Sequence, residues 1–296
     1  MIKTMNYVFF GLEFEFEPIA FTVPGTSWGV YWYGILITLG FVLAVIYGMK
    51  RAKKFGIDND RLLDCILVTA PLAIVGARAY YIIFDESLTF SEFFDIHDGG
   101  LAIYGGVIVA VVVGAIMCKL RKINILSTLD LTVLGFLVGQ AIGRWGNFIN
   151  QEAYGYTTGS SWFGISGDKI VEQMNTQMPV HPCFLYESLW CALGFIILHF
   201  ISKKRKFTGQ IAASYLVWYG FGRFFIEYFR TDSLYLGANI KVSMLLSGLM
   251  VAAGIILLVI GFKKADNSKI SVKYVPVFDE SEDEIEKSVA EEKNNG

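Results

Sequence analysis

Seven long apolar stretches recur along the chain, and short polar connections separate them. A membrane-spanning helix needs roughly 20 mostly apolar residues, and each stretch approaches that length. We therefore expect an all-α integral membrane protein with seven transmembrane helices, over residues 28–49, 62–84, 101–118, 126–149, 183–201, 209–229 and 241–262. The pattern divides the chain into an N-terminal arm (1–27), a transmembrane domain (28–262) and a tail (263–296).

The two flanks have patterns of their own. Residues 12–17 alternate apolar side chains with glutamates, which predicts a short strand or an interfacial arm. Such an arm either lies on the outer surface or gates a site. The tail is acidic, with the run from Asp279 to Glu284, and has too few apolar residues to fold. We expect a disordered cytoplasmic tail that the chemistry does not need.

Composition agrees with a membrane protein. Apolar residues make up 54% of the chain and charged residues 18%, against about 25% charge in soluble domains. The net charge of -2 gives no basic surplus for neutralising phosphates, so we expect no nucleic-acid partner. The four cysteines, at 65, 118, 183 and 191, are scattered and have no metal or disulfide spacing.

Lysine and arginine predict the orientation, because they concentrate in cytoplasmic loops. Fourteen of them lie in the connections after the first, third, fifth and seventh stretches, against four on the other side. The N-terminus is therefore expected outside and the C-terminus in the cytoplasm.

Three arginines lie within apolar stretches: Arg78, Arg144 and Arg223. An ion inside a membrane costs at least about 2.5–3.5 kcal/mol and marks function by default. Each lies five or six residues before the outer end of its stretch, roughly 8–9 Å deep at the rise of a helix. A shared depth predicts one cationic pocket open to the outer leaflet. Separate arginines that snorkel to the boundary are the alternative.

Helical spacing gathers polar groups around two of these arginines. Tyr219, Arg223 and Glu227 step by four, so Arg223 and Glu227 can pair. The neighbours of Arg144 on one helical face are Gln140, Asn147 and Gln151, with Asn150 and Glu152 at the outer end. Glycines 135, 139 and 143 form a stripe that lets another helix approach closely.

Further polar groups enter from stretches that begin outside, namely Tyr33, Tyr104, His181, Tyr186 and Glu187. We find no metal-ligand cluster, nucleophile elbow or nucleotide loop, so no cofactor is expected. Arginine forks suit phosphate oxygens, and at this depth the anion would be a phospholipid headgroup. These residues leave open a lipid-modifying enzyme, an anion transporter and a receptor.

One motif is long and specific. Residues 143–155, Gly-Arg-Trp-Gly-Asn-Phe-Ile-Asn-Gln-Glu-Ala-Tyr-Gly, closely resemble the signature of the prolipoprotein diacylglyceryl transferases. Blocks at 31–34, 99–106, 181–187 and 219–230 resemble the same family and follow its order, so the resemblance covers about 28–262.

The resemblance implies an activity in the bacterial cell membrane, with the active site towards the extracytoplasmic leaflet. Such an enzyme moves the diacylglyceryl group of phosphatidylglycerol to the lipobox cysteine thiol of a prolipoprotein. A thioether forms and glycerol 1-phosphate leaves. The alternative is an outer-leaflet anion or lipid transporter that uses the same arginines, although we find no internal repeat of the kind many transporters have.

The resemblance also implies roles for residues. Arg144 would bind the phosphatidylglycerol headgroup, Arg223 would be a second essential arginine, and Tyr33, Asn147 and Glu152 would shape the pocket. Many members have histidine where this chain has Tyr104, and that histidine is a proposed thiol base. Tyrosine is a poorer base at pH 7, so we expect Tyr104 to orient substrate while the arginines favour the thiolate. We predict Arg144, Arg223, Tyr104 and Glu227 as catalytic, and Arg144, Tyr33, Asn147, Asn150, Glu152, Tyr219 and Arg78 as substrate-binding.

Overall fold

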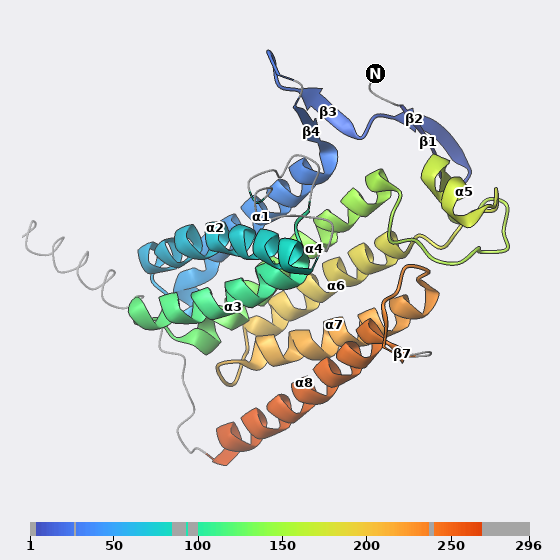
Figure 1. Cartoon of the computed structure of the whole chain (residues 1–296). Helices are drawn as coiled ribbons and strands as arrows, with labels where there is room; N and C mark the ends of the chain where they lie inside the picture. The colour runs from blue at the N-terminus through green and yellow to red at the C-terminus, as the bar shows by residue number, and fades with distance from the viewer. Residues whose placement is uncertain (1–3, 27, 85–92, 94–99, 237–239, 268–296) are drawn as a thin grey trace, which may run out of the picture. The chain divides into compact units, whose positions relative to one another are not determined.

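The computed structural model describes residues 4–26, 28–84, 93, 100–236 and 240–267. The chain is mostly helical in these ranges, with short strands beside the helices rather than the all-α content that the sequence predicts. The long helices are α1 (Trp32–Arg51), α2 (Asn59–Phe84), α3 (Ile103–Leu120), α4 (Ile125–Asn150), α6 (Cys183–Ser202), α7 (Gln210–Phe229) and α8 (Val242–Asn267) (Figure 1). Each falls on one of the predicted stretches.

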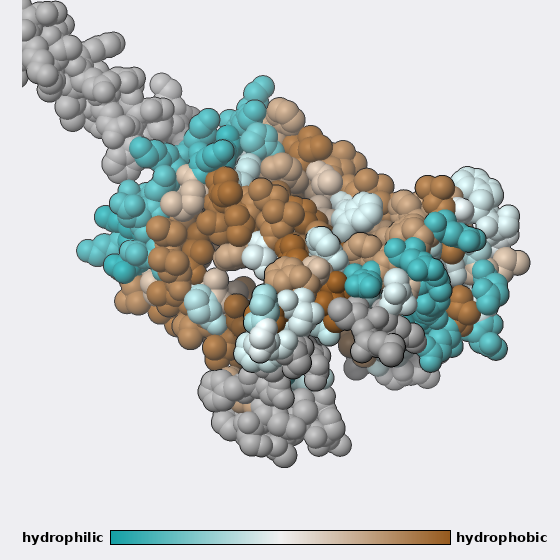
Figure 2. Space-filling model, turned by 90° about the horizontal axis from the view of Figure 1, so that it is seen from above, coloured by the Kyte–Doolittle hydropathy of each residue, from teal (hydrophilic) through white to brown (hydrophobic). Residues whose placement is uncertain are grey.

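Within the described ranges, six helices are long and apolar enough to cross a membrane: α1, α2, α3, α4, α6 and α8. Their apolar side chains are widely exposed, as the brown regions of Figure 2 show. Helix α7 is long enough but is not one of the six. Its sequence carries Arg223 and Glu227 together with several tyrosines, and these lower its hydropathy.

The described chain forms two compact units. The first contains residues 1–47 and 132–271, and the second contains residues 48–131. Helices α1 and α4 contribute to both units.

In the first unit, glycines bring helices together. A Cβ on Gly40 of α1 would lie 3.1 Å from the Cα of Gly139 of α4, and one on Gly135 would lie 3.2 Å from the Cβ of Ala44. The predicted small-residue stripe of α4 therefore packs against α1. Helix α7 packs against both α6 and α8 (Figure 1).

The N-terminal arm is a β-hairpin. Strand β1 (Met5–Phe9) pairs antiparallel with β2 (Leu12–Phe16), and the turn residues Phe10 and Gly11 both have positive φ, as a type I′ turn requires. The predicted alternation over 12–17 is confirmed as strand. On its other side β1 pairs with β5 (Ile165–Gly167), so the sheet order is β2-β1-β5.

Two smaller strand pairs lie beside helix ends. β3 (Ile19–Thr22) pairs with β4 (Gly29–Tyr31), so α1 begins at Trp32 rather than at the predicted residue 28. β6 (Tyr235–Leu236) pairs with β7 (Ile240–Lys241) before α8. A short helix, α5 (Asp168–Met174), follows β5. These elements cap the ends of α1, α4 and α8.

In the second unit, α2 and α3 form a tight pair with a short 3-10 helix, η1 (Ala52–Phe55). A Cβ on Gly105 would collide with the backbone oxygen of Gly76, so these glycines let the helices touch. In the first unit, α8 continues to Asn267, beyond the predicted boundary at 262. The first five residues of the predicted disordered tail, 263–267, are therefore helical, and the rest of it, 268–296 with the acidic run, lies outside the described residues.

Candidate active site

One carboxylate in the first unit binds two of the three arginines that lie within apolar stretches. Glu187, in the second turn of α6, is 3% exposed. Its Oε1 accepts a hydrogen bond of 2.6 Å from Nη2 of Arg144 on α4, and its Oε2 accepts one of 3.0 Å from Nη1 of Arg223 on α7. Three helices therefore meet at one buried carboxylate, and the two guanidinium groups are held by the same partner.

The partners on α7 complete this group. The Tyr219 hydroxyl donates a hydrogen bond of 2.9 Å to Oε1 of Glu187, and Arg223 forms an ion pair of 2.7 Å with Glu227. The i,i+4 spacing predicted this pair. We call Arg144, Glu187, Tyr219, Arg223 and Glu227 the charged cluster.

The two arginines are fixed without being fully covered. Their side chains are 22% exposed for Arg144 and 14% for Arg223, whereas the side chains of Glu187 and Glu227 are 4% and 1% exposed. Carboxylates thus hold the guanidinium groups from the buried side. N–H groups that these bonds do not use can meet an anion on the open side.

A second layer of charge follows the end of α7. Arg230 donates two hydrogen bonds, of 2.9 and 2.7 Å, to the carboxylate of Asp232, and Nζ of Lys241 donates to the carbonyls of Glu227 and Arg230. Burial raises the pKa of Asp232, but hydrogen bonds and charge from Arg230 outweigh it, so the pKa lies below its usual value. Asp232 therefore stays ionised at neutral pH. These bonds tie the end of α7 to the residues before α8.

The C-terminal end of α4 gathers the predicted amides. Asn147 accepts a hydrogen bond of 3.3 Å from Arg144 and donates one of 2.8 Å to Glu152, and Asn150 donates a longer one, of 3.3 Å, to Glu152. The amide of Glu152 also donates to the carbonyl of Asn147, which turns the chain back over the helix end. Arg144, Asn147, Asn150 and Glu152 are thus brought together as predicted.

Gln151 does not share this face, contrary to the spacing. Helix α4 ends at Asn150 and Gln151 has φ of 52°, so its side chain leaves the helical register. It is 2% exposed, donates to the carbonyl of Asn6 in β1 and accepts from the amide of Lys169 in α5. Gln151 therefore holds the sheet to α4 and has a structural role.

Tyr33 packs beside this end of α4. A Cβ on Gly146 would collide with the ring of Tyr33, so only glycine allows that approach. Gly146 directly precedes Asn147, and Tyr33 is 38% exposed. Tyr33, like Glu152, is thus in the same unit as the charged cluster.

Arg78 and Tyr104 belong to the second unit. Arg78 of α2 is 5% exposed, and its guanidinium donates to the carbonyls of Phe93 at 3.1 Å and Gly100 at 3.0 Å. Gly100 has φ of 75°, and a Cβ there would collide with that guanidinium. Tyr104, in the first turn of α3, is 45% exposed, with its ring 6.4 Å from that of Tyr80. Their roles in substrate binding and catalysis stay predictions.

The central position of Glu187 among the arginines was not predicted from the sequence. Glu187 is the single acidic residue in the apolar helix α6, and an intramembrane carboxylate calls for a cationic partner. That signal was available, but the identity of the partners was not. Among the described residues, no group of three or more His, Cys, Asp or Glu could hold a metal ion, and the four cysteines are free and buried.

Comparison with known proteins gives a consistent result. The family model for prolipoprotein diacylglyceryl transferase matches residues 18–260. A phosphatidylglycerol–prolipoprotein diacylglyceryl transferase of Finegoldia magna is 47% identical over 246 residues, which are 81% of this chain and 94% of the relative. Enzymes of the same name are 41% identical in Clostridioides difficile, over 85% of this chain and 98% of the relative, and 45% identical in Streptococcus mutans, over 78% and 90%.

Proposed function

The chain belongs to the prolipoprotein diacylglyceryl transferase family, and we propose that its reaction takes place at the charged cluster. The enzyme transfers the diacylglyceryl group of phosphatidylglycerol to the cysteine thiol of a prolipoprotein. The observation that supports this location is Glu187, which binds Arg144 and Arg223 through its two oxygens.

Arg144 and Arg223 hold the phosphate of the lipid. A guanidinium binds phosphate oxygens through parallel hydrogen bonds, and its planar fork fixes their direction. Glu187 and Glu227 set the angle of the arginines before the lipid binds. Preorganised charges cost no reorganisation at the moment of reaction, and a low dielectric strengthens them.

The transfer exchanges one bond for another. The sulfur of the acceptor cysteine attacks C3 of the glyceryl group, and the bond from C3 to the phosphate oxygen breaks. The electron pair of that bond goes to the phosphate, so glycerol 1-phosphate leaves with more negative charge than the diester had. The arginines stabilise this growing charge, while the thiol proton is lost to solvent or a base.

The remaining predicted residues act around this step. Tyr219 keeps Glu187 oriented through its hydrogen bond. Tyr33, Asn147, Asn150 and Glu152 line the path of the headgroup at the outer end of α4. Tyr104 orients the thiol or the lipid.

We propose the fuller topology of seven spans, with the N-terminus outside and the active site towards the extracytoplasmic leaflet. Helix α7 has 20 residues, long enough to cross the apolar core, and its charges pair with those of its neighbours. The excess of basic residues in alternate connections supports the orientation. Peptide and lipid would then meet on the side where exported proteins emerge.

The direct test is product formation. The purified full-length protein would be incubated with phosphatidylglycerol and a peptide that carries a lipobox cysteine. We expect a diacylglyceryl thioether and an equal amount of glycerol 1-phosphate, with neither formed by an Arg144→Ala variant that inserts normally. Movement of lipid across a vesicle membrane without thioether would contradict the proposal and indicate transport.

A further inference from the structure

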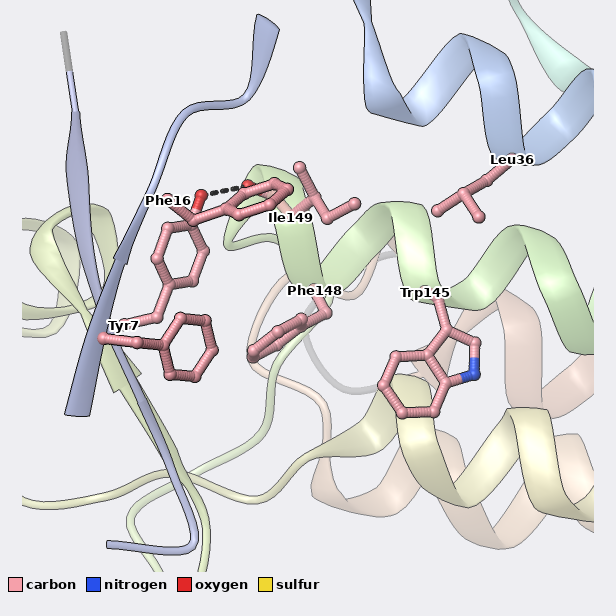
Figure 3. Close-up of a pocket in the computed structure, with 7 residues that line it drawn as sticks. Tyr7, Phe16, Leu36, Trp145, Phe148 and Ile149 are labelled. Atoms are coloured by element: carbon pink, nitrogen blue, oxygen red, sulfur yellow. Dashed lines mark hydrogen bonds between the residues drawn. The ribbon is translucent and has the colours of Figure 1, made fainter. Parts of the chain in front are cut away.

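An apolar groove opens in the first unit, the unit that also holds the charged cluster. It has a volume of about 310 Å³ and lies between the N-terminal hairpin and the outer ends of α1 and α4 (Figure 3). Tyr7, Phe14 and Phe16 line it from the hairpin, Leu36 from α1, and Trp145, Phe148 and Ile149 from α4. The Tyr7 hydroxyl is bonded to the carbonyl of Ile149, so it offers the groove no free polar group (Figure 3).

The position of the groove argues against a lipid tail as its occupant. Trp145, Phe148 and Ile149 follow Arg144 along α4 and lead towards the helix end at Asn150. A lipid whose phosphate binds Arg144 extends its acyl chains towards the middle of the bilayer, which is the opposite direction. The apolar occupant on this side is therefore delivered by the other substrate, the peptide.

The hairpin offers that peptide a free backbone edge. Among the described residues, β2 pairs with β1 alone and forms one edge of the sheet. The amide of Asn6 donates to the carboxylate of Asp168 in α5, and the amide of Phe10 donates to the carbonyl of Gly164, just before β5. Both amides therefore point away from β2. Backbone groups alternate sides along a strand, so those of Met5, Tyr7 and Phe9 point towards β2. The paired residues of β2, namely Phe16, Phe14 and Leu12, point their backbone groups towards β1. The backbone N–H and C=O groups of Glu13 and Glu15 therefore face outward.

The side chains of β2 suit a peptide rather than another acidic surface. Phe14 and Phe16 line the groove, while Glu13 and Glu15 belong to the opposite face of the strand. Carboxylates along an open edge oppose pairing between copies of the enzyme. They also repel an anionic phospholipid.

We propose that the prolipoprotein segment around the acceptor cysteine binds as an added strand along β2, with an apolar side chain in this groove. Main-chain hydrogen bonds supply affinity in such strand addition, and pockets for alternate side chains supply specificity. The inference rests on the proposed function, since it names how the peptide of that reaction is recognised.

Glu15→Pro tests the backbone contact, with Glu15→Ala as its matched control. Both variants remove the carboxylate, but only proline removes the outward N–H. We expect proline to raise the peptide KM by about 2- to 13-fold, the equivalent of one hydrogen bond. The KM for phosphatidylglycerol and the kcat at saturating peptide should match those of the alanine variant. Equal peptide KM values for the two variants would overturn strand addition.

Phe14→Ala tests the groove. It should raise the KM of an apolar peptide about tenfold, and it should matter little for a peptide whose groove residue is replaced by serine, because interacting sites give non-additive effects. A series of peptides with serine at each apolar position near the cysteine would identify that residue. A change in the lipid KM with the peptide KM unaltered would overturn the proposal and assign the groove to an acyl chain.

Hydrogen exchange keeps the proposal testable if either variant folds poorly. The wild-type enzyme would be measured with and without a peptide whose cysteine is replaced by serine, which binds without reacting. Protection of the amides of residues 12–16 is expected, and unchanged exchange there would overturn the proposal. Failure of the proposed function is distinguishable, because the wild-type enzyme would then form no thioether.

Discussion

Arg144 and Arg223 in one unit, and Arg78 in the other, lie within apolar stretches but have different described partners. The first two share the carboxylate of Glu187, at 2.6 and 3.0 Å. Arg78 donates to two backbone carbonyls, those of Phe93 and Gly100. A carboxylate between two helices sets the angle of a guanidinium that stays partly open, whereas Arg78, which binds these two carbonyls, is only 5% exposed. The described partners and the exposure of an arginine in an apolar stretch therefore indicate its task better than its depth does.

The largest effect should come from the arginines of the charged cluster. Arg144→Ala and Arg223→Ala should each lower kcat by about 10²–10³ or more, the cost of losing one preorganised charge at a developing oxyanion. Lysine should rescue poorly, because it lacks the planar fork. The assay measures initial rates at saturating lipid, normalised to inserted protein. Activity near normal in either alanine variant would contradict the phosphate-binding role.

Glu187→Gln should have the next largest effect. The amide keeps the size of the side chain but loses its charge, so Arg144 and Arg223 lose the ion-pair partner that they share. We expect kcat to fall by about 10–100-fold, as for groups that orient a ligand without touching the reaction. Stability should fall too, because two buried arginines lose a partner. An unchanged kcat in the folded fraction would contradict the role of Glu187 in orienting the arginines.

Arg78→Ala should separate the two kinds of arginine. The two lost hydrogen bonds from a charged group are worth about 1.5–3 kcal/mol each, so the unfolding temperature should fall. Activity per folded molecule should fall by less than about tenfold. A loss comparable to that of Arg144→Ala, with unchanged stability, would instead support the lipid contact that the sequence predicts.

Tyr104→Phe should also have a small effect on rate. The loss of one orienting hydrogen bond costs about 0.5–1.5 kcal/mol, or roughly 2- to 13-fold. General-base catalysis is worth about 10²–10⁴-fold, so a thousandfold loss that Tyr104→His restores would make Tyr104 the proton acceptor. Rates of the three proteins against pH would distinguish the roles.

The spacing of residues along the sequence predicted the features that depend on local backbone geometry. It located the seven long helices and the strand at 12–16, and it anticipated the Arg223–Glu227 pair because four residues make one helical turn. It also gathered Asn147, Asn150 and Glu152, which are close in sequence.

The contacts that the sequence did not predict depend on tertiary packing and on where elements end. Arg144 and Glu187 are 43 residues apart, and only the packing of α4 beside α6 makes them partners. The spacing failed at Gln151 because the helix ends one residue earlier, and the backbone then turns to positive φ. The pairing of β1 with β5 also depends on a strand of three residues, which is too short to give a pattern.

The most direct test of the account is a double-mutant cycle between Arg144→Ala and Arg223→Ala, measured as kcat/KM for phosphatidylglycerol. If Glu187 makes the two arginines one phosphate clamp, the first substitution already disables it. The double variant should then be no more than a few-fold slower than the slower single variant, because residues that act as a unit are strongly non-additive. Losses that multiply, so that the double variant falls by the product of the two single effects, would contradict a shared clamp and leave two independent arginines.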